Sequence, residues 1–176
     1  MRGGKRKGST GLDYKGYLIK GLRILRLDGT AALEVAKDEK AFLPGVMVLV
    51  IGGVAAGAGM LMTGAVAVKD VTFLILAMPF LNVVSYALFM FVFHLIARLF
   101  GGKATFGEYF RAVSFGSIIT WTQVVPLFGM VASLWSIPVN IFILEKVHGL
   151  RRIEAVAIMS LMMLAALAML RYMHYI

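Results

Sequence analysis

Residues 112–144 read AVSFGSIITWTQVVPLFGMVASLWSIPVNIFIL and contain no charged side chain. The run is too long for one membrane-spanning helix, because about 20 apolar residues already cross the roughly 30 Å of hydrocarbon in a bilayer. Pro126 and Gly129 lie near its middle, where the proline removes a backbone hydrogen-bond donor and the glycine adds flexibility. We therefore predict two membrane-spanning helices joined by a hairpin at Pro126.

Three further charge-free runs, 41–68, 71–97 and 155–170, each predict one more span. Thr105 and Glu108 have the spacing of a capping box, so the helix before the hairpin can begin directly after Thr105 and reach a spanning length. The expected fold is therefore an all-α polytopic membrane helix bundle. Its five transmembrane helices are expected at about 42–67, 71–99, 106–125, 127–146 and 152–173.

The distribution of Lys and Arg predicts the orientation of this bundle. With five spans, the N-terminal segment and the loops around 98–111 and 145–154 hold all of the 18 Lys and Arg residues except Lys69 and Arg171. An excess of basic residues in cytoplasmic loops is the positive-inside rule. We therefore expect the N-terminus and these loops in the cytoplasm and the C-terminus on the other side.

Composition agrees with a bilayer protein and excludes several other classes. Apolar residues make up 60% of the chain and the mean hydropathy is +0.87, more than a soluble domain of 176 residues can bury. The absence of cysteine excludes disulfides, cysteine-ligated zinc and iron–sulfur clusters. The basic residues behind the net charge of +9 border apolar runs, so the expected partners are the lipid bilayer and its anionic lipids rather than nucleic acid.

No nucleophile motif, phosphate loop or paired metal-binding motif accompanies this composition. Glu145 and His148 have the spacing found at di-iron sites, but such sites need a second copy and further glutamates on facing helices. We therefore expect no enzyme activity, no cofactor and no metal.

Residues 1–40 are expected to form a basic cytoplasmic tail with interfacial helices, and residues 41–174 the transmembrane domain. Leu18, Leu22 and Leu25 recur at helical spacing with basic residues to one side, which is typical of a helix lying among lipid headgroups. A cytoplasmic helix packed on loop ends fits the pattern equally well. Asp28-Gly29-Thr30 predicts the start of a second short helix over about 31–40.

Six basic residues of this segment are candidates for binding lipid headgroups: Lys5, Arg6, Lys7, Lys20, Arg23 and Arg26. Each Lys or Arg near an anionic leaflet contributes about 1 kcal/mol, so several together would hold the segment on the membrane. The alternative is that these charges serve only to set the insertion topology.

Small and polar residues mark contacts between the predicted spans. Gly53, Gly57 and Gly59 on the first span allow close helix packing, either within one subunit or in a homo-oligomer. Four polar residues are expected to face the bundle interior, where they form either interhelical hydrogen bonds or a polar pathway or ligand pocket: Asn82, Tyr86, Gln123 and Asn140. No charged residue lies at mid-membrane, which argues against ion-coupled transport.

The second half of the chain resembles a known family in the order and spacing of its motifs. These are Gly101-Gly102-Lys103-Ala104-Thr105-Phe106 followed by Glu108, the mid-hairpin Pro126, then Trp135, and finally the His148-Gly149-Leu150 loop. Together they resemble the Yip domain family over roughly residues 25 to 172. The eukaryotic members are five-span Golgi and endoplasmic reticulum proteins that interact with Rab GTPases. The short basic N-terminal segment is more similar to the archaeal and bacterial members.

This resemblance implies a multi-pass membrane protein, in the cell membrane if prokaryotic and in endomembranes if eukaryotic. The function it implies is non-enzymatic: a membrane-organising or partner-binding scaffold of a trafficking-related family, with an unknown protein partner and a possible homo-oligomeric state. The alternative function is a small transporter or channel with a polar path between spans two to four.

Overall fold

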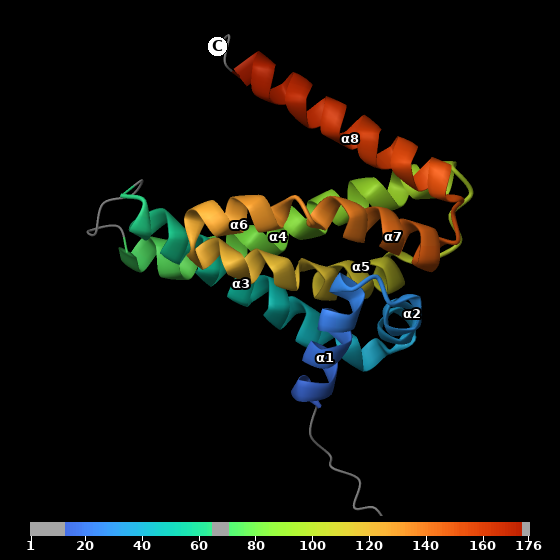
Figure 1. Ribbon diagram of the computed structural model, residues 1–176, viewed down its shortest axis with the longest axis horizontal. Helices are drawn as coiled ribbons and strands as arrows, with labels where there is room; N and C mark the ends of the chain where they lie inside the picture. Colours follow the sequence, from blue (N-terminus) through green and yellow to red (C-terminus); the bar gives the residue numbers. More distant parts are fainter. Residues whose placement is uncertain (1–12, 65–70, 174–176) are drawn as a thin grey trace, which may run out of the picture.

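The computed structural model describes residues 13–64 and 71–173, which are helical apart from short connections and contain no strand (Figure 1). The first half comprises α1 (Tyr14–Leu25), α2 (Gly29–Lys37), the 3-10 turn η1 (Glu39–Ala41), α3 (Phe42–Met62) and α4 (Val71–Leu99). The second half comprises α5 (Phe106–Gly116), the 3-10 helix η3 (Ser117–Val124), α6 (Pro126–Ser133), α7 (Ser136–His148) and α8 (Arg152–Met173).

Four helical segments are long and apolar enough to cross a membrane: Glu39–Met62, Val71–Leu99, Pro126–His148 and Arg152–Met173. The predicted span at 106–125 is helical but differs from them, because α5 continues as a 3-10 helix from Ser117. At 1.5 Å per residue in α5 and 2.0 Å in η3, the pair is about 32 Å long. Five spans thus remain a prediction.

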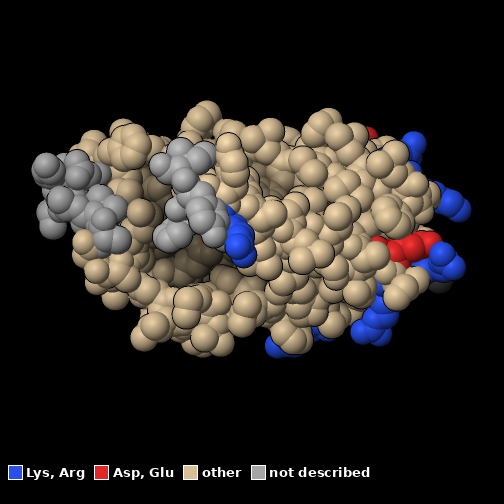
Figure 2. All heavy atoms as spheres, turned by 90° about the horizontal axis from the view of Figure 1, so that it is seen from above, with Lys and Arg blue, Asp and Glu red and all other residues tan. Residues whose placement is uncertain are grey.

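Successive long segments run in alternating directions in Figure 1. α3, α5 with η3, and α8 start at the end that carries α1 and α2, whereas α4 and α6 with α7 return to it. We call this end, with the connections 100–105 and 149–151, the basic end. Most charged side chains on the face shown in Figure 2 gather there, and most of the remaining surface is uncharged.

Local sequence signals account for several helix ends. The capping box at α5 is present, since the Glu108 amide donates to Thr105 Oγ1 at 3.3 Å and the Thr105 amide donates to Glu108 Oε2 at 2.7 Å. Pro126 occupies the first turn of α6, where its missing N–H costs nothing. Gly149 ends α7 with φ of 70°, a left-handed conformation that glycine adopts without strain.

The segment predicted as one helix at 127–146 is interrupted between α6 and α7. Pro138 explains the break, because its ring cannot donate to the carbonyl of Leu134, four residues earlier, and would clash with it in a regular helix. The chain passes through Leu134 and Trp135 as a turn before α7 begins. The predicted break at Pro126 is present, and the break before Pro138 was not predicted.

α1 packs on the bundle through residues other than the leucines that recur at helical spacing. Tyr17, Gly21 and Ile24 are buried against α5 and η3, while Leu18 and Leu22 are exposed. Gly21 favours this close approach, because a Cβ there would lie 2.2 Å from Ile118 Cδ1 and 3.4 Å from the Phe115 carbonyl oxygen. α1 therefore packs on the side of the bundle rather than on loop ends.

The core lies toward the basic end, where α1, α2, α5 and α7 meet. Its large, fully buried side chains include Ile24, Val35, Tyr109, Phe115, Ile143 and Leu144. The outward faces of α4 and α8 instead expose large apolar side chains such as Leu76, Leu88 and Leu164. This distribution is the one expected when lipid rather than water surrounds the long helices.

Candidate functional site

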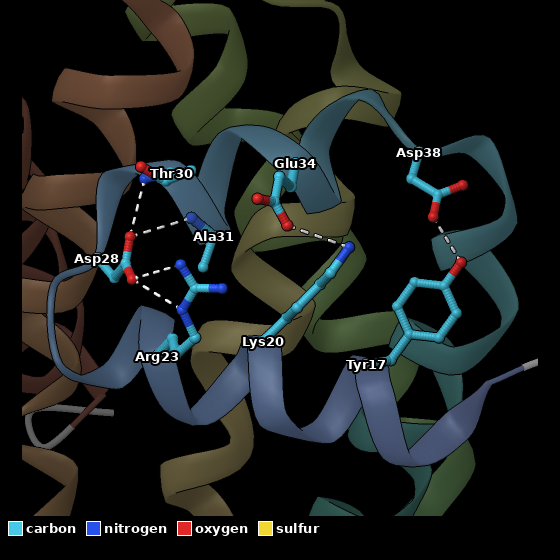
Figure 3. A network of polar contacts seen from close by, with 8 residues as sticks. All are labelled: Tyr17, Lys20, Arg23, Asp28, Thr30, Ala31, Glu34 and Asp38. Atoms are coloured by element: carbon cyan, nitrogen blue, oxygen red, sulfur yellow. Dashed lines mark hydrogen bonds and ion pairs between the residues drawn. The ribbon is translucent and has the colours of Figure 1, made fainter.

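One side of α1 carries polar side chains that reach carboxylates on and beside α2 (Figure 3). The three pairs are Tyr17 Oη to Asp38 Oδ2 at 2.6 Å, Lys20 Nζ to Glu34 Oε2 at 3.2 Å, and Arg23 to Asp28 through Nε at 2.8 Å and Nη2 at 2.7 Å. Asp28 also accepts the amides of Thr30 and Ala31, so it caps α2 while it pairs with α1. These contacts fix the two short helices relative to each other.

We call these three pairs between α1 and the α2 region the α1–α2 seam. The hydrogen bonds and ion pairs within it shift the pKa values of its side chains. The hydrogen bond from Arg23, followed by that from the Ala31 amide, lowers the pKa of Asp28 below its ordinary value. Burial, reinforced by the hydrogen bond to Asp38, raises the pKa of Tyr17 to about 12. At neutral pH, therefore, Asp28 is charged and Tyr17 is neutral.

A second side of α1 attaches it to the bundle. The ring of Tyr17 stacks on Phe115 with centroids 5.8 Å apart. At the C-terminal end of α1, the indole Nε1 of Trp135 donates to the carbonyl of Leu25 at 2.8 Å. Trp135 lies at the break between α6 and α7, so this break presents a donor to α1.

The third side of α1 faces away from α2 and is apolar. Tyr14, Leu18 and Leu22 follow helical spacing along it and are exposed by 48%, 38% and 51%. Lys15 and Arg26 border this side and make no ion pair with any residue that the structure describes. α1 thus has one side on the bundle, one on α2 and one free and amphipathic.

The predicted headgroup-binding residues fall into three groups. Lys5, Arg6 and Lys7 lie outside the described residues. Lys20 and Arg23 are engaged by carboxylates of the α1–α2 seam, and Arg26 is exposed beside the apolar side. Lys15, which was not among the predicted residues, is exposed in a position equivalent to that of Arg26.

The predicted packing glycines of α3 all lie at close approaches within the chain. A Cβ at Gly53 would lie 2.5 Å from Pro79 Cα, and one at Gly59 would lie 2.2 Å from the Gln123 carbonyl oxygen. Gly57 is less crowded, with Met78 Cβ at 3.6 Å. α4 and η3 thus cover these positions within the chain, and a homo-oligomer stays a prediction.

The predicted buried polar residues lie in two places. Gln123 donates to Ser133 Oγ at 3.5 Å, across the hairpin between η3 and α6. Asn82, Tyr86 and Asn140 instead line a cavity of about 550 Å³ between α4, α5, α7 and α8. The amide of Asn82 donates to the Leu49 carbonyl at 2.6 Å, and that of Asn140 to the Ser136 carbonyl at 2.8 Å.

Two of the family-type motifs, the Gly101–Phe106 turn and the His148-Gly149-Leu150 loop, meet at the basic end around His148. Its side chain is fully buried, and a Cβ at Gly102 would lie 2.7 Å from its Nδ1. The ring centroid of His148 lies 5.3 Å from that of His94 and 4.9 Å from that of Tyr109. The amide of Lys103 donates to the His148 carbonyl at 3.0 Å, which ties the turn after α4 to the end of α7.

Sequence reasoning missed the pairing of His94 with His148, because residues on different spans carry no local signal of contact. His94 Nδ1 and both ring nitrogens of His148 are buried without a hydrogen-bond partner among the described residues. Within the same residues, no group of three or more His, Cys, Asp or Glu side chains could hold a metal ion.

Comparison with family models adds to this geometry. The model described as the Yip1 domain matches residues 24–172. The chain belongs to the Yip1 domain family. This family is associated with membrane trafficking and is not known for enzymatic activity. Comparisons with curated proteins and with solved structures gave no match.

Membership of the Yip1 family agrees with the apolar helices of the structure, so the chain is a multi-pass membrane protein. The match begins within α1 and ends at the last turn of α8. It therefore includes α2, the hairpin and His148 with its neighbours, whereas Tyr17, Lys20 and Arg23 of α1 precede it.

Proposed function

We propose that this Yip1-family protein is a non-enzymatic membrane-organising protein that holds α1 as a fixed amphipathic helix among the headgroups of the cytoplasmic leaflet. The observation that carries the proposal is the division of α1 into a bundle side, an α2 side and an exposed apolar side. Helices with segregated apolar and basic sides bind in the plane of the interface, with the apolar side buried below the headgroups.

The placement of α1 supports this role. In Figure 1, α1 lies across the direction of the long helices and near the basic end. If the long helices cross the bilayer, α1 runs parallel to its surface. The Trp135 and Tyr17 contacts hold it there, so it would occupy area in one leaflet only.

A helix that occupies area in one leaflet only would favour curved membranes and hence small vesicles. This consequence of the proposal is tested with two leucines of equal exposure. Leu18 on the apolar side of α1 and Leu33 on α2 are both 38% exposed. The full chain is reconstituted at equal density in liposomes, and vesicle diameter is measured by electron cryomicroscopy. We expect Leu18→Ser to give larger vesicles than the wild type, because the apolar side no longer inserts, and Leu33→Ser to match the wild type. Equal diameters for Leu18→Ser and the wild type would contradict the proposal.

Anionic lipids are the proposed ligands of Lys15 and Arg26, the basic residues that border the apolar side of α1. We expect Arg26→Gln to lose about 1 kcal/mol of preference for phosphatidylglycerol over phosphatidylcholine, or roughly fivefold. Lys20→Gln should lose less, because Glu34 already holds Lys20. The measurement is the ratio of the two lipids retained by the purified protein. A larger effect for Lys20→Gln than for Arg26→Gln would argue against this assignment.

The alternative function, a small transporter or channel, draws on the cavity that Asn82, Tyr86 and Asn140 line. It requires a continuous polar path, whereas most of the cavity lining is apolar. The test is flux of small polar solutes into proteoliposomes. Flux that Asn140→Leu removes while the fold is kept would favour the transporter over the organising role.

A further inference from the structure

The cavity between α4, α5, α7 and α8 has features that a membrane-organising role does not require. Its volume of about 550 Å³ lies within the range of small-molecule sites, roughly 300 to 1,000 Å³. α8 diverges from α4 in Figure 1, and Phe89 of the cavity lining is 57% exposed. The cavity therefore communicates with the outer face of the long helices, where lipid is expected.

Methionines supply much of the apolar wall. Five line the cavity: Met78, Met90, Met159, Met162 and Met163. Met is unbranched, flexible and polarisable, and it is common on surfaces that accept apolar partners of varied shape. This wall fits a hydrocarbon chain better than a ligand of one rigid shape.

Polar groups with unused hydrogen-bonding capacity also line the cavity. Ser85, Tyr86 and Tyr109 have hydroxyls with no hydrogen-bond partner among the described residues, and Tyr109 is only 1% exposed. Asn82 and Asn140 use their amide N–H groups on backbone carbonyls, which leaves the side-chain oxygen of each as an acceptor. If lipid rather than water fills the opening of the cavity, these hydroxyls have no water to bond, so a ligand that bonds to one of them gains affinity.

The charge of the lining limits the ligand. Among the described residues that line the cavity there is no Asp, Glu, Lys, Arg or His side chain. An ionised ligand group would lack a counter-charge in a low-dielectric site, which is strongly unfavourable. The ligand must therefore be uncharged.

We propose that this cavity binds an uncharged, bilayer-soluble molecule with a hydroxyl or carbonyl group, of the diacylglycerol or isoprenoid-alcohol kind. The hydrocarbon lies against the methionines, and the polar group hydrogen-bonds with Tyr86, Tyr109 and the Asn140 side-chain oxygen. The molecule enters from the bilayer between α4 and α8.

The test uses diazirine-bearing diacylglycerol with the full-length protein in phosphatidylcholine nanodiscs. We expect photolabel in peptides that contain Ser85–Met90 and Met159–Met163. Excess unlabelled diacylglycerol or isoprenoid alcohol should remove the label. The more effective competitor shows which of these two ligand types the cavity prefers. Label spread over all lipid-facing helices, or removed equally by excess phosphatidylcholine, would overturn the proposal.

Two variants and one control complete the test. Met159→Trp fills the cavity and should abolish competable labelling, whereas Leu164→Trp places the same side chain on the lipid-facing side of α8 and should leave it unchanged. Tyr86→Phe removes one hydroxyl with almost no change in shape and should weaken competition by about three- to tenfold. If Met159→Trp does not fold, unchanged competition in Tyr86→Phe is sufficient to reject the proposed polar contact.

Discussion

Gly102 is the residue at which the turn between α4 and α5 is most tightly constrained. Its amide donates to the Ala97 carbonyl at 2.8 Å, and a Cβ there would lie 2.7 Å from both that carbonyl oxygen and His148 Nδ1. Both neighbours are held in place, one as backbone and the other as a fully buried ring. The glycine thus allows the turn to pack directly on the end of α7.

Gly102→Ala should therefore destabilise the protein by about 1 to 3 kcal/mol, the usual cost of overpacking. The measurement is thermal unfolding in detergent, followed by circular dichroism. Gly107→Ala is the matched control, because its Cβ would meet only the flexible end of Arg111 at 3.3 Å. Equal unfolding temperatures for the two variants would show that the turn is not constrained as described.

Tyr17 makes the stability of the folded protein depend on pH, and the raised pKa of its phenol gives the direction of this dependence. The folded state holds the phenol proton more tightly than the unfolded chain, because burial and Asp38 raise the pKa to about 12 from 10.0. Its contribution is fully present below pH 10 and is lost as the pH rises through about 12. Asp13 and Asp38 are the carboxylates that oppose its ionisation, and Lys20 lies 5.9 Å from the ring centroid.

The unfolding temperature of the wild type should therefore fall more steeply between pH 10 and 12 than that of Tyr17→Phe, which has no phenol proton to lose. Comparing the two variants removes the contribution of the other tyrosines. Parallel curves would mean that the Tyr17–Asp38 contact does not form in solution.

At the scale of elements, the contact between α3 and α4 depends on one glycine facing one proline. Gly53 lies against the backbone of Met78 and Pro79, and the latter sits inside α4 without ending it. Proline removes a hydrogen bond from a helix interior, and in membranes a closely packed neighbour commonly accompanies it. Gly53 permits α3 to be that neighbour.

Gly53→Ala should separate α3 from α4 and destabilise the protein by about 1 to 3 kcal/mol. Gly57→Ala is the control on the same helix, because its Cβ would be in ordinary contact with Met78 at 3.6 Å. Unfolding temperature and oligomeric state are measured together. A change in oligomeric state without a change in unfolding temperature would instead place Gly53 at an interface between copies.

For the whole molecule, the number of membrane spans can be found by determining on which side of the membrane each segment between helices lies. Because the chain has no cysteine, single cysteines can be labelled selectively with a membrane-impermeant maleimide. With five spans, Lys103→Cys and Arg151→Cys should react from one side, and Thr63→Cys and Val125→Cys from the other. If α5 and η3 do not cross, Val125→Cys and Lys103→Cys will react from the same side.

Local patterns in the sequence predict several of the helices and several of their ends. The structure has α4 at Val71–Leu99 and α8 at Arg152–Met173, the residues for which charge-free runs predict helices. Asp28, Thr105 and Pro126 mark helix starts through hydrogen bonds and steric effects within a few residues. Such local interactions, together with apolar length, can be recognised without knowledge of distant contacts.

Contacts between residues far apart in the sequence follow from the packing of the helices. The buried side of α1, the pairing of Lys20 and Arg23 with carboxylates of the α2 region, and the contact of His94 with His148 depend on how helices pack. The same is true of the cavity beside α8, whose lining comes from four helices. Helical spacing shows that residues share a face, but the approach distance that small residues such as Gly21 and Gly53 allow decides which face is buried.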